Sequence, residues 1–499
     1  MKVSDIISAA INNKRRKTIM KMKVNAFMKE SDGITPEQLE ELKTFAGKNA
    51  GISQLRDGYF GTAVSDPKKA APRFNATTKI GHTSIAGHAK IEVIFENTTR
   101  LFAMIMNSLQ YYDTTEKSGR FTEMTGNNPE QCALYDKWNA IFKQRILEIH
   151  PDYNDAFITK QLKNKSISGF IVKNGRIYAN DINADTENML DITDDPDTAP
   201  VLKEIMDNPR LPVNTRSQEN ARYILSIFTK STTFGYTTSL DQWNFIYDWC
   251  HKYMDQFGTK GDVMLRINKD GSTRPATWFE QNIYTDLSEL ANFIRENLYC
   301  PTIRDHKKRG FDMLTEIFDP DHPMQKYDHC NETIRFSYLT DYYASFIVLS
   351  HLDRHRTIKY WMLLDSLCKP GTYGFFIPPS IRDTNWEAEW LRDMESVKDL
   401  YPQGMMIHII EAGTLDNFVL KTSERLCGCA MWETMDNVCR LAEKFAVHYE
   451  SGNATDLEKT YIEKFYDPGT RHLRTKNTIT DGCREGCYFG CGHALDRIV

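Results

Sequence analysis

Apolar and polar residues alternate in several short stretches of the chain, and a largely apolar run follows each of them. Residues 89–97 (AKIEVIFEN) alternate as in a half-buried β-strand, and residues 99–112 (TRLFAMIMNSLQYY) are apolar enough for a buried helix. Upstream, residues 35–49 start with Thr-Pro-Glu and carry helical periodicity, which predicts an amphipathic helix. The pattern therefore predicts an α+β fold.

The same order of strand and helix returns later in the chain. Residues 329–356 hold a His, an alternating strand and an apolar helix that ends at a polar motif. Residues 228–249 and 404–426 each predict a strand, a turn and a helix. These paired orders predict two tandem, strongly diverged repeats, each an antiparallel or mixed sheet flanked by helices. The first copy would span residues 1–306 and the second residues 307–499.

A polar and acidic stretch at about residues 150–215 interrupts the first copy. Within it, residues 168–181 (SGFIVKNGRIYAND) place two apolar runs on either side of Asn-Gly, which is typical of a β-hairpin. We expect this region to form an inserted lobe or a lid.

Composition narrows the class of protein. The chain has 499 residues, of which 41% are hydrophobic and 11% aromatic, enough for two to four domains with their own cores. The formal charge of −5 gives no overall basic field, so we expect no nucleic-acid or anionic-membrane partner. No apolar run is long enough to span a membrane, and the N-terminus lacks the pattern of a secretory signal. These features predict a cytoplasmic location.

The first candidate site is the stretch DTTEKSGRF at residues 113–121. Glu116, Ser118 and Arg120 are set two apart, so in an extended segment they would point to one side and could converge on one anionic ligand. A solvated strand face is the alternative reading of such a triplet. GHTSIAGH, at residues 81–88, adds two histidines on either side of a small-residue turn.

The second candidate site is Arg354-His355-Arg356, at the end of an apolar stretch. Its three side chains offer many hydrogen-bond donors and could bind a pyrophosphate or an electron-rich ring. The alternative is a solvated helix end whose cations complement the helix dipole.

Together these motifs resemble the flavin-dependent thymidylate synthase family, in which a His segment, a strand, a helix, Arg-His-Arg and Glu-x-Ser-x-Arg follow in that order. In the first copy, residues 116–120 match this spacing, but Ser-Leu-Gln at 108–110 replaces Arg-His-Arg. In the second copy, Arg-His-Arg is intact at 354–356, but residues 357–370 contain no Glu-x-Ser-x-Arg. Each motif therefore survives once. Two downstream segments, 221–245 and 401–433, resemble the family's next strand and helix.

The resemblance implies a role for each matched residue. The implied substrate-binding residues are Glu116, Ser118, Gly119, Arg120, Arg222 and Arg425, and the implied catalytic residues among them are Glu116, Arg120 and Arg222. The implied flavin-binding residues are His82, Ser84, His88, Asn244, Arg354, His355 and Arg356.

The resemblance also implies an activity. The chain would convert deoxyuridine monophosphate to thymidylate, with methylenetetrahydrofolate as carbon donor, reduced flavin adenine dinucleotide (FAD) as hydride source and NADPH as reductant. Family enzymes are tetramers, so a two-copy chain is expected to form a homodimer that imitates a tetramer. One alternative is another flavin-dependent transfer at C5 of a pyrimidine nucleotide, such as hydroxymethylation. The other is a non-catalytic, nucleotide-binding duplicate.

The cysteines give a separate signal, because several of the eleven lie near the C-terminus. Cys483, Cys487 and Cys491 are spaced four apart, as on one helical face or around a tight knuckle. Cys427, preferred over Cys429 on the predicted helix before it, would complete a four-thiolate structural zinc site. Free buried thiols and an iron–sulfur or redox role are the alternatives.

Overall fold

The computed structural model describes residues 21–26, 29–31, 33–54, 66–79, 83–109, 112–117, 128–179, 189–230, 232–268, 270–303, 337–363, 367, 369–427 and 430–474. The chain divides into two compact units. Unit 1 comprises Met1–Ala103, Tyr111–Glu116 and Lys230–Lys308, and unit 2 comprises Met104–Gln110, Lys117–Thr229 and Arg309–Val499. The last change of unit lies close to the predicted boundary at residue 306, but residues 117–229 of the predicted first copy belong to unit 2. Unit 2 therefore combines segments of both predicted copies.

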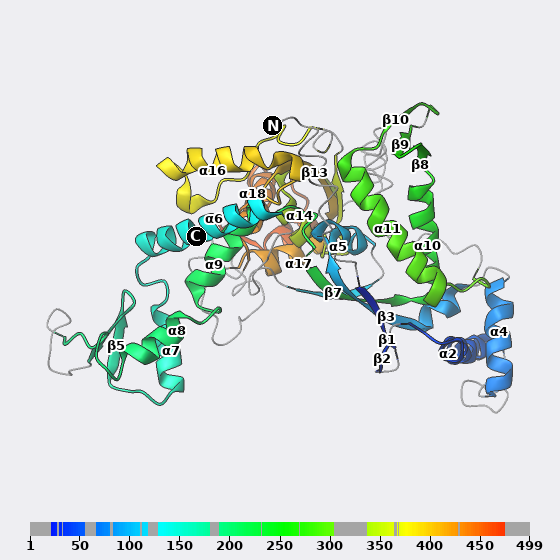
Figure 1. The fold of residues 1–499 in the computed structure, drawn as a ribbon, viewed down its shortest axis with the longest axis horizontal. Coiled ribbons are helices and arrows are strands. Elements are labelled where there is room, and N and C mark those ends of the chain that lie inside the picture. Colours follow the sequence, from blue (N-terminus) through cyan, green and yellow to red (C-terminus); the bar gives the residue numbers. More distant parts are fainter. Residues whose placement is uncertain are drawn as a thin grey trace. The chain divides into compact units, whose positions relative to one another are not determined.

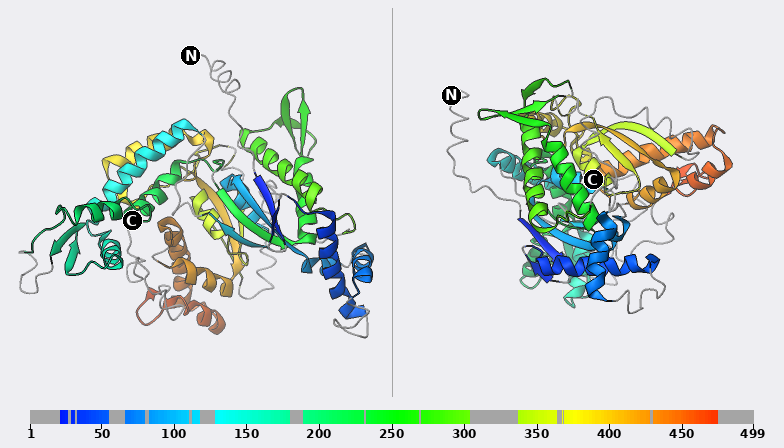
Figure 2. Two further views of the ribbon diagram at one scale, coloured as in Figure 1. Left: turned by 60° about the horizontal axis from the view of Figure 1, so that its bottom comes forward. Right: turned by 90° about the vertical axis from the view of Figure 1, so that its right-hand side faces the viewer.

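A five-stranded antiparallel sheet lies at the centre of unit 1 (Figure 2). In spatial order its strands are β2 (Lys29–Ser31), β1 (Lys21–Ala26), β3 (Lys90–Thr98), β7 (Thr232–Ser239) and β4 (Asp113–Glu116). Alternate side chains of β3 are buried, as its sequence predicted: Ile91, Val93 and Phe95. Phe95 stacks on Phe234 of β7, with ring centroids 4.7 Å apart.

Helices and a small sheet complete unit 1. The helices are α2 (Pro36–Gln54), α4 (Pro67–Lys79), the 3-10 helix η1 (Thr83–His88), α5 (Arg100–Asn107), which continues into unit 2, α10 (Leu240–Met254) and α11 (Trp278–Asn297). The small sheet consists of β8 (Phe257–Lys260), β9 (Val263–Ile267) and β10 (Thr273–Pro275). Helices α10 and α11 lie side by side (Figure 1).

The helix predicted over residues 99–112 is shorter than its sequence suggested, and this expectation is corrected. Helix α5 ends at Asn107, where the Ser108 hydroxyl donates to the carbonyl of Ile105 at 2.7 Å. Tyr112 already belongs to the sheet region, since its ring stacks on Tyr236 at 4.9 Å. The apolar residues continue past the helix because they stay buried in the turn and sheet.

Unit 2 contains a three-stranded antiparallel sheet ordered β11 (Ser337–Ser345), β13 (Met406–Thr414) and β12 (Lys359–Met362). The helices that follow its strands or pack nearby are α14 (Phe346–Leu352), α17 (Leu415–Arg425), α18 (Trp432–Glu450) and α19 (Asp456–Ile462). The other elements outside the insert are α6 (Pro129–Ile149), α9 (Pro212–Ala221), η2 (Arg222–Ile224), η3 (Pro379–Ile381), α16 (Asn385–Ser396), η4 (Lys398–Leu400), β14 (Tyr466–Asp467) and β15 (His472–Leu473).

The order of elements around the two sheets is the same. In the first, β3 leads into α5 and then β4, and β7 later enters between these strands and leads into α10. In the second, β11 leads into α14 and then β12, and β13 enters between them and leads into α17. Both strand-to-helix junctions of the later pair carry a hydroxyl residue followed by Leu-Asp, at residues 239–241 and 414–416.

Within unit 2, residues 223–227 run antiparallel to residues 401–404. The amide of Ile227 donates to the carbonyl of Tyr401 at 3.0 Å, and the amide of Gln403 donates to that of Leu225 at 2.7 Å. Between them, Ser226 and Pro402 form an antiparallel bridge. The two bonds are reciprocal about this bridge.

Helices α6 and α16 also pack together in unit 2. Trp138 and Trp390 meet edge to face, with ring centroids 4.9 Å apart. The Trp138 indole donates to the Asp393 carboxylate at 2.8 Å, and Lys137 donates to the same carboxylate at 2.7 Å. Aromatic contact and charge together hold these two helices.

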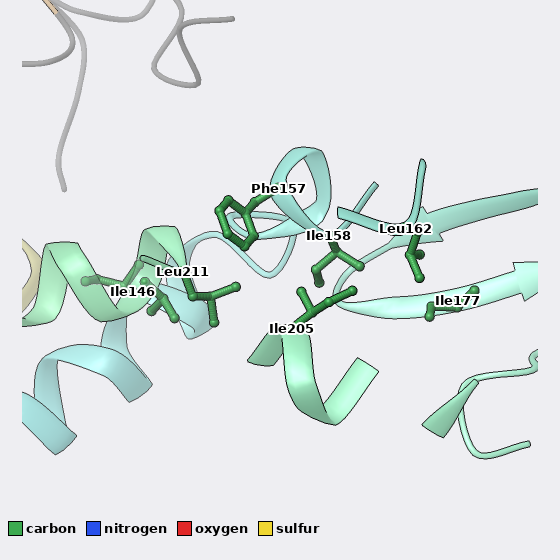
Figure 3. Close-up of a cluster of buried hydrophobic side chains, with 8 residues drawn as sticks. Ile146, Phe157, Ile158, Leu162, Ile177, Ile205 and Leu211 are labelled. Carbon is green, nitrogen blue, oxygen red and sulfur yellow. The ribbon is translucent and has the colours of Figure 1, made fainter. Parts of the chain in front are cut away.

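The acidic insert is a folded lobe with its own apolar core (Figure 3). Its elements are α7 (Asp155–Asn164), β5 (Phe170–Lys173), β6 (Arg176–Ala179) and α8 (Ala199–Met206). The core residues shown include Phe157, Ile158, Leu162, Ile177 and Ile205. The predicted hairpin is confirmed, because Asn174 and Gly175 both have positive φ, as a two-residue turn of this kind requires.

Across the part of the chain that the structure describes, no helix is both long and apolar enough to cross a membrane. The fold is α+β, as the sequence predicted.

Candidate functional site: an arginine and histidine cluster in unit 2

Two arginines and two histidines from three separate stretches of sequence meet in unit 2. Arg222 begins η2, His351 lies in the last turn of α14, and Arg425 ends α17. His355 follows α14 in the Arg-His-Arg motif. Helix α18 packs against both α14 and α17, and Thr434 in its first turn lies 3.2 Å from His351.

Arg222 is buried and faces His351. Its Nη2 atom lies 3.4 Å from His351 Nε2 and 3.2 Å from the Met431 sulfur. Because a guanidinium only donates, Nε2 of His351 is the acceptor and Nδ1 carries the proton. Nδ1 can then donate to the Thr434 hydroxyl, 3.2 Å away. These contacts fix both the position of Arg222 and the tautomer of His351.

Arg425 holds the segment after α14. Its Nε donates to His355 Nε2 at 3.0 Å, and its Nη2 donates to the carbonyl of His351 at 2.8 Å. Burial lowers the pKa of His355 to about 2, with further lowering by the charges of Arg425, Lys421 and Arg354. His355 is therefore neutral near pH 7 and accepts from Arg425, so the approach of Glu424 to its ring at 3.9 Å is not an ion pair.

Arg354 and Arg356 are exposed on either side of His355. The two motif arginines can therefore reach a ligand from solvent, while Arg425 is half-buried and Arg222 is buried. Burial is the main reason that His355 stays neutral, and the charges of Arg425, Lys421 and Arg354 lower its pKa further. Such a concentration of cations favours an anion such as a phosphate or pyrophosphate.

A buried carboxyl lies beside this cluster at the start of α18. Glu433 Oε2 accepts from the Tyr223 hydroxyl at 2.9 Å and from the Ser345 hydroxyl at 2.6 Å. Oε1 accepts from the Ser345 amide at 2.9 Å. Burial raises the pKa of Glu433 to about 7, although the bonds from Ser345 and Tyr223 lower it in part. The carboxyl therefore changes its charge near neutral pH.

This titration gives a prediction about stability. Between pH 4.5 and 7 the unfolded chain releases the Glu433 proton while the folded chain keeps it, so stability should fall as pH rises through this window and level off above it. The contribution is up to about 3 kcal/mol. Urea unfolding of Glu433→Gln should show a smaller fall over the same window. An equal fall in both proteins would contradict the assignment.

A second buried polar network lies behind the cluster and was not predicted from the sequence. Lys421 of α17 and Glu411 of β13 form a fully buried ion pair, with both carboxylate oxygens 2.7 Å from Nζ. The hydroxyls of Tyr338 and Tyr342 donate to Glu411 at 2.6 and 2.8 Å. The one sequence signal was a Glu at an inward position of an otherwise apolar strand.

Three predicted site residues lie in unit 1. Glu116, at the end of β4, forms a largely buried ion pair with Arg100, the first residue of α5. Asn244 is buried in α10, where its amide donates to the Cys300 carbonyl at 2.7 Å and accepts from the Cys300 amide at 3.0 Å. His88 is exposed at the end of η1. The contacts of Asn244 in this structure are internal.

Unit 2 holds the remaining predicted residues that are described. The structure brings Arg222, Arg425 and His355 together around His351, with Arg354 and Arg356 flanking His355. Sequence reasoning assigned Arg222 to the substrate side of the first copy, and here it contacts residues of the second copy. His351, Tyr223 and Thr434 were not predicted, because single polar residues next to apolar runs carry no distinctive signal.

Some predicted residues lie outside the described part of the chain: His82, Ser118, Gly119, Arg120, Cys483, Cys487 and Cys491, together with the side chain of Ser84. Cys427 is buried, but it lies beyond α17, which ends at Arg425, so its predicted place on the helix is corrected. The turn at Leu426, whose amide still bonds to Thr422, carries the chain away from the helix axis. Among described residues, no group of three or more His, Cys, Asp or Glu side chains could hold a metal. The zinc site stays a prediction.

No protein-family model matches this chain, and no curated protein is significantly similar to it.

Proposed function

We propose that this protein is a flavin-dependent thymidylate synthase built from two tandem copies. The observation that carries the proposal is the meeting of Arg222, Arg425 and the Arg-His-Arg segment in unit 2. Those residues were selected by their resemblance to family motifs, and they come from distant parts of the chain. Their convergence on one cationic cluster is expected of a site for phosphorylated ligands.

The order of elements supports the tandem arrangement. Strands β3, β7 and β4 of the first sheet have the same order as β11, β13 and β12 of the second, and the strand-to-helix transitions also correspond. The reciprocal bonds of residues 223–227 and 401–404 join the segments that precede β7 and β13, the two corresponding strands. A homodimer of this chain would then provide four copies.

The cluster fits the phosphate-bearing part of FAD. Arg354 and Arg356 are exposed and can donate to a pyrophosphate, and the neutral His355 between them is fixed by Arg425. We assign flavin binding in unit 2 to these residues. His82, Ser84, His88 and Asn244 stay the flavin-binding residues that the resemblance implies in the first copy. When bound, the reduced flavin supplies the hydride. The chain itself supplies binding and orientation.

The nucleotide would be held by arginines. Arg222 and Arg425 offer guanidinium donors in unit 2, and Arg120 with Ser118 and Gly119 would complete the phosphate site by resemblance. Glu116, fixed by Arg100, would orient the substrate or flavin. Methylenetetrahydrofolate and NADPH are the remaining proposed small-molecule partners.

An absorbance spectrum of the purified full chain tests the proposal. Bound flavin with bands near those of free FAD would support a flavin enzyme. A colourless protein that also takes up no added FAD would overturn it and favour the non-catalytic alternative. Product analysis with deoxyuridine monophosphate then separates methylation from hydroxymethylation.

Arg120→Ala should weaken binding of deoxyuridine monophosphate. A charge-assisted contact to a phosphate contributes about 1.5–3 kcal/mol, so the affinity should fall by about one to two orders of magnitude. Calorimetry of the full chain measures this. Arg210→Ala, an exposed arginine of the lobe region, is the matched control and should bind as the wild type does. Equal affinity of Arg120→Ala and wild type would count against the assignment.

A further inference from the structure

Glu433 connects the two elements that face each other across the cation cluster. Through Tyr223 it holds η2, where the neighbouring residue is Arg222. Through the amide and hydroxyl of Ser345 it holds the N-terminus of α14, the helix that carries His351. The next residue of α18, Thr434, contacts His351 directly. The first turn of α18 therefore contacts both sides of the Arg222–His351 pair.

We propose that Glu433 is a positioning residue: its carboxylate holds η2 and the start of α14 in the register that sets Arg222 against His351, and so controls the affinity of the cluster for a phosphate. This inference rests on the proposed function only for the choice of deoxyuridine monophosphate as the ligand. Binding of a phosphate anion to the cluster does not depend on that function. Glu433 acts through Tyr223 and Ser345 and need not touch the ligand.

The bonding pattern shows why an ionised carboxylate suits this role. All three of these bonds are donated to Glu433, and its Oε2 atom receives two of them. A protonated carboxyl accepts these bonds more weakly than a carboxylate, and an amide turns a donor toward either the Ser345 amide or the two hydroxyls, so at least one of the three bonds is lost or must reverse its direction. The connection between η2 and α14 is therefore strongest with the charged form.

That charged form is unfavourable for folding, because the side chain is buried and its pKa is raised to about 7. The groups that act on Glu433 directly are Ser345, Tyr223 of η2 and Asp436 on its own helix. The charges of Arg222 and Glu219 act on Tyr223, and His351 contacts the neighbouring Thr434. If Glu433 is a positioning residue, its replacement should weaken binding without lowering stability. If it only supports the fold, its replacement should lower stability.

The residue next to Arg222 also allows a conservative test. The Tyr223 ring packs on Phe376 with centroids 4.7 Å apart, and its carbonyl accepts from the Gly404 amide at 2.7 Å. Gly404 permits this approach, since a Cβ there would lie 2.9 Å from Tyr223 Cβ. Removing only the hydroxyl, by Tyr223→Phe, leaves this packing in place. The variant should fold and should lose the hydrogen bond that links Glu433 to η2.

The experiment measures binding of inorganic pyrophosphate and of deoxyuridine monophosphate to the full chain by calorimetry, at pH 6 and pH 8. At pH 8, Glu433→Gln should have equal or higher thermal stability than wild type. It should bind each ligand about tenfold more weakly, because the alignment of Arg222 loses the free energy of about one hydrogen bond. The ratio of wild-type to variant affinity should shrink at pH 6, where wild-type Glu433 is protonated. Measuring both proteins in the same buffers cancels the titration of the ligand. Tyr223→Phe should weaken binding by a similar factor at pH 8, and this difference from wild type should also shrink at pH 6.

Asp286→Asn is the matched control. Asp286 is a buried carboxyl of unit 1 with a pKa raised by burial to about 6, and it accepts from Thr99 at 3.0 Å. Its substitution should leave both affinities unchanged. Unchanged binding in Glu433→Gln and Tyr223→Phe would overturn the positioning role.

The two ligands separate the failure of this inference from that of the proposed function. A wild-type chain that binds pyrophosphate but no deoxyuridine monophosphate would refute the proposed function, and the pyrophosphate data would still decide the role of Glu433. A chain that binds neither ligand would refute both.

Discussion

Replacing Arg354 and Arg356 together with alanine should remove bound flavin from the protein. Each guanidinium can make charge-assisted bonds worth about 1.5–3 kcal/mol to a pyrophosphate. Losing both should weaken FAD binding by about two to four orders of magnitude. Both side chains are exposed, so the fold should survive. Absorbance after gel filtration measures retained flavin, and thermal unfolding checks the fold.

The control must remove the same charge elsewhere in unit 2. Arg392 and Arg471 are exposed arginines away from the motif, and their joint replacement by alanine should leave the flavin in place. If the Arg354→Ala/Arg356→Ala protein keeps stoichiometric flavin, the assignment of FAD to the second copy is wrong.

Lys421→Met should destabilise the protein by about 3–5 kcal/mol, because it leaves the Glu411 carboxylate buried without its cation. The two tyrosine hydroxyls that bind Glu411 cannot compensate for the lost charge. Burial lowers the pKa of Lys421, and the Glu411 carboxylate opposes this shift, so the pair depends on both members. Urea unfolding at pH 7 gives the free energy.

A second substitution shows whether charge is the cause. In Lys421→Met/Glu411→Gln, the neutral amide can still bond Tyr338 and Tyr342 and needs no cation, so most of the lost stability should return. Lys444→Met, at an exposed position of α18, should change stability by less than about 0.5 kcal/mol. A double variant as unstable as Lys421→Met would mean that lost packing, not an unpaired charge, explains the effect.

Local patterns were sufficient for most elements around the two sheets. Strands β3, β7, β11 and β13 and the helices that follow them lie where alternation and apolar runs predicted, because half-burial imposes those patterns directly. The end of α5 was not predictable in this way. Apolar residues after Asn107 are buried by a turn and by β7, and a local window cannot distinguish that burial from helix packing.

The buried interior shows a further limit of pattern reading. In unit 1, the rings of Phe95 and Phe234 stack in the core beside β3 and β7. In the sheet of unit 2, β13 buries Glu411 against Lys421. A charged residue in a strand is ordinarily read as exposed, and only the spatial meeting of Glu411 with Lys421 makes its burial favourable.

The candidate site was predictable as a set of motifs but not as a set of contacts. Arg354, His355 and Arg356 stood out because arginine and histidine concentrate at phosphate sites, and Arg425 was implied by the family resemblance. That Arg222 would face His351, and that Glu433 would hold both elements, depends on contacts between residues far apart in sequence. Such contacts follow from the fold and leave no local periodicity.

The most direct test of the proposed function is the product formed from deoxyuridine monophosphate. The full chain is incubated anaerobically with FAD, NADPH, methylenetetrahydrofolate and the nucleotide. The products are separated by chromatography and identified by mass spectrometry. The proposal predicts thymidylate that depends on all four components and is lost in Arg354→Ala/Arg356→Ala. A hydroxymethylated nucleotide would assign the alternative transfer, and unchanged substrate from a flavin-loaded protein would contradict the proposed activity.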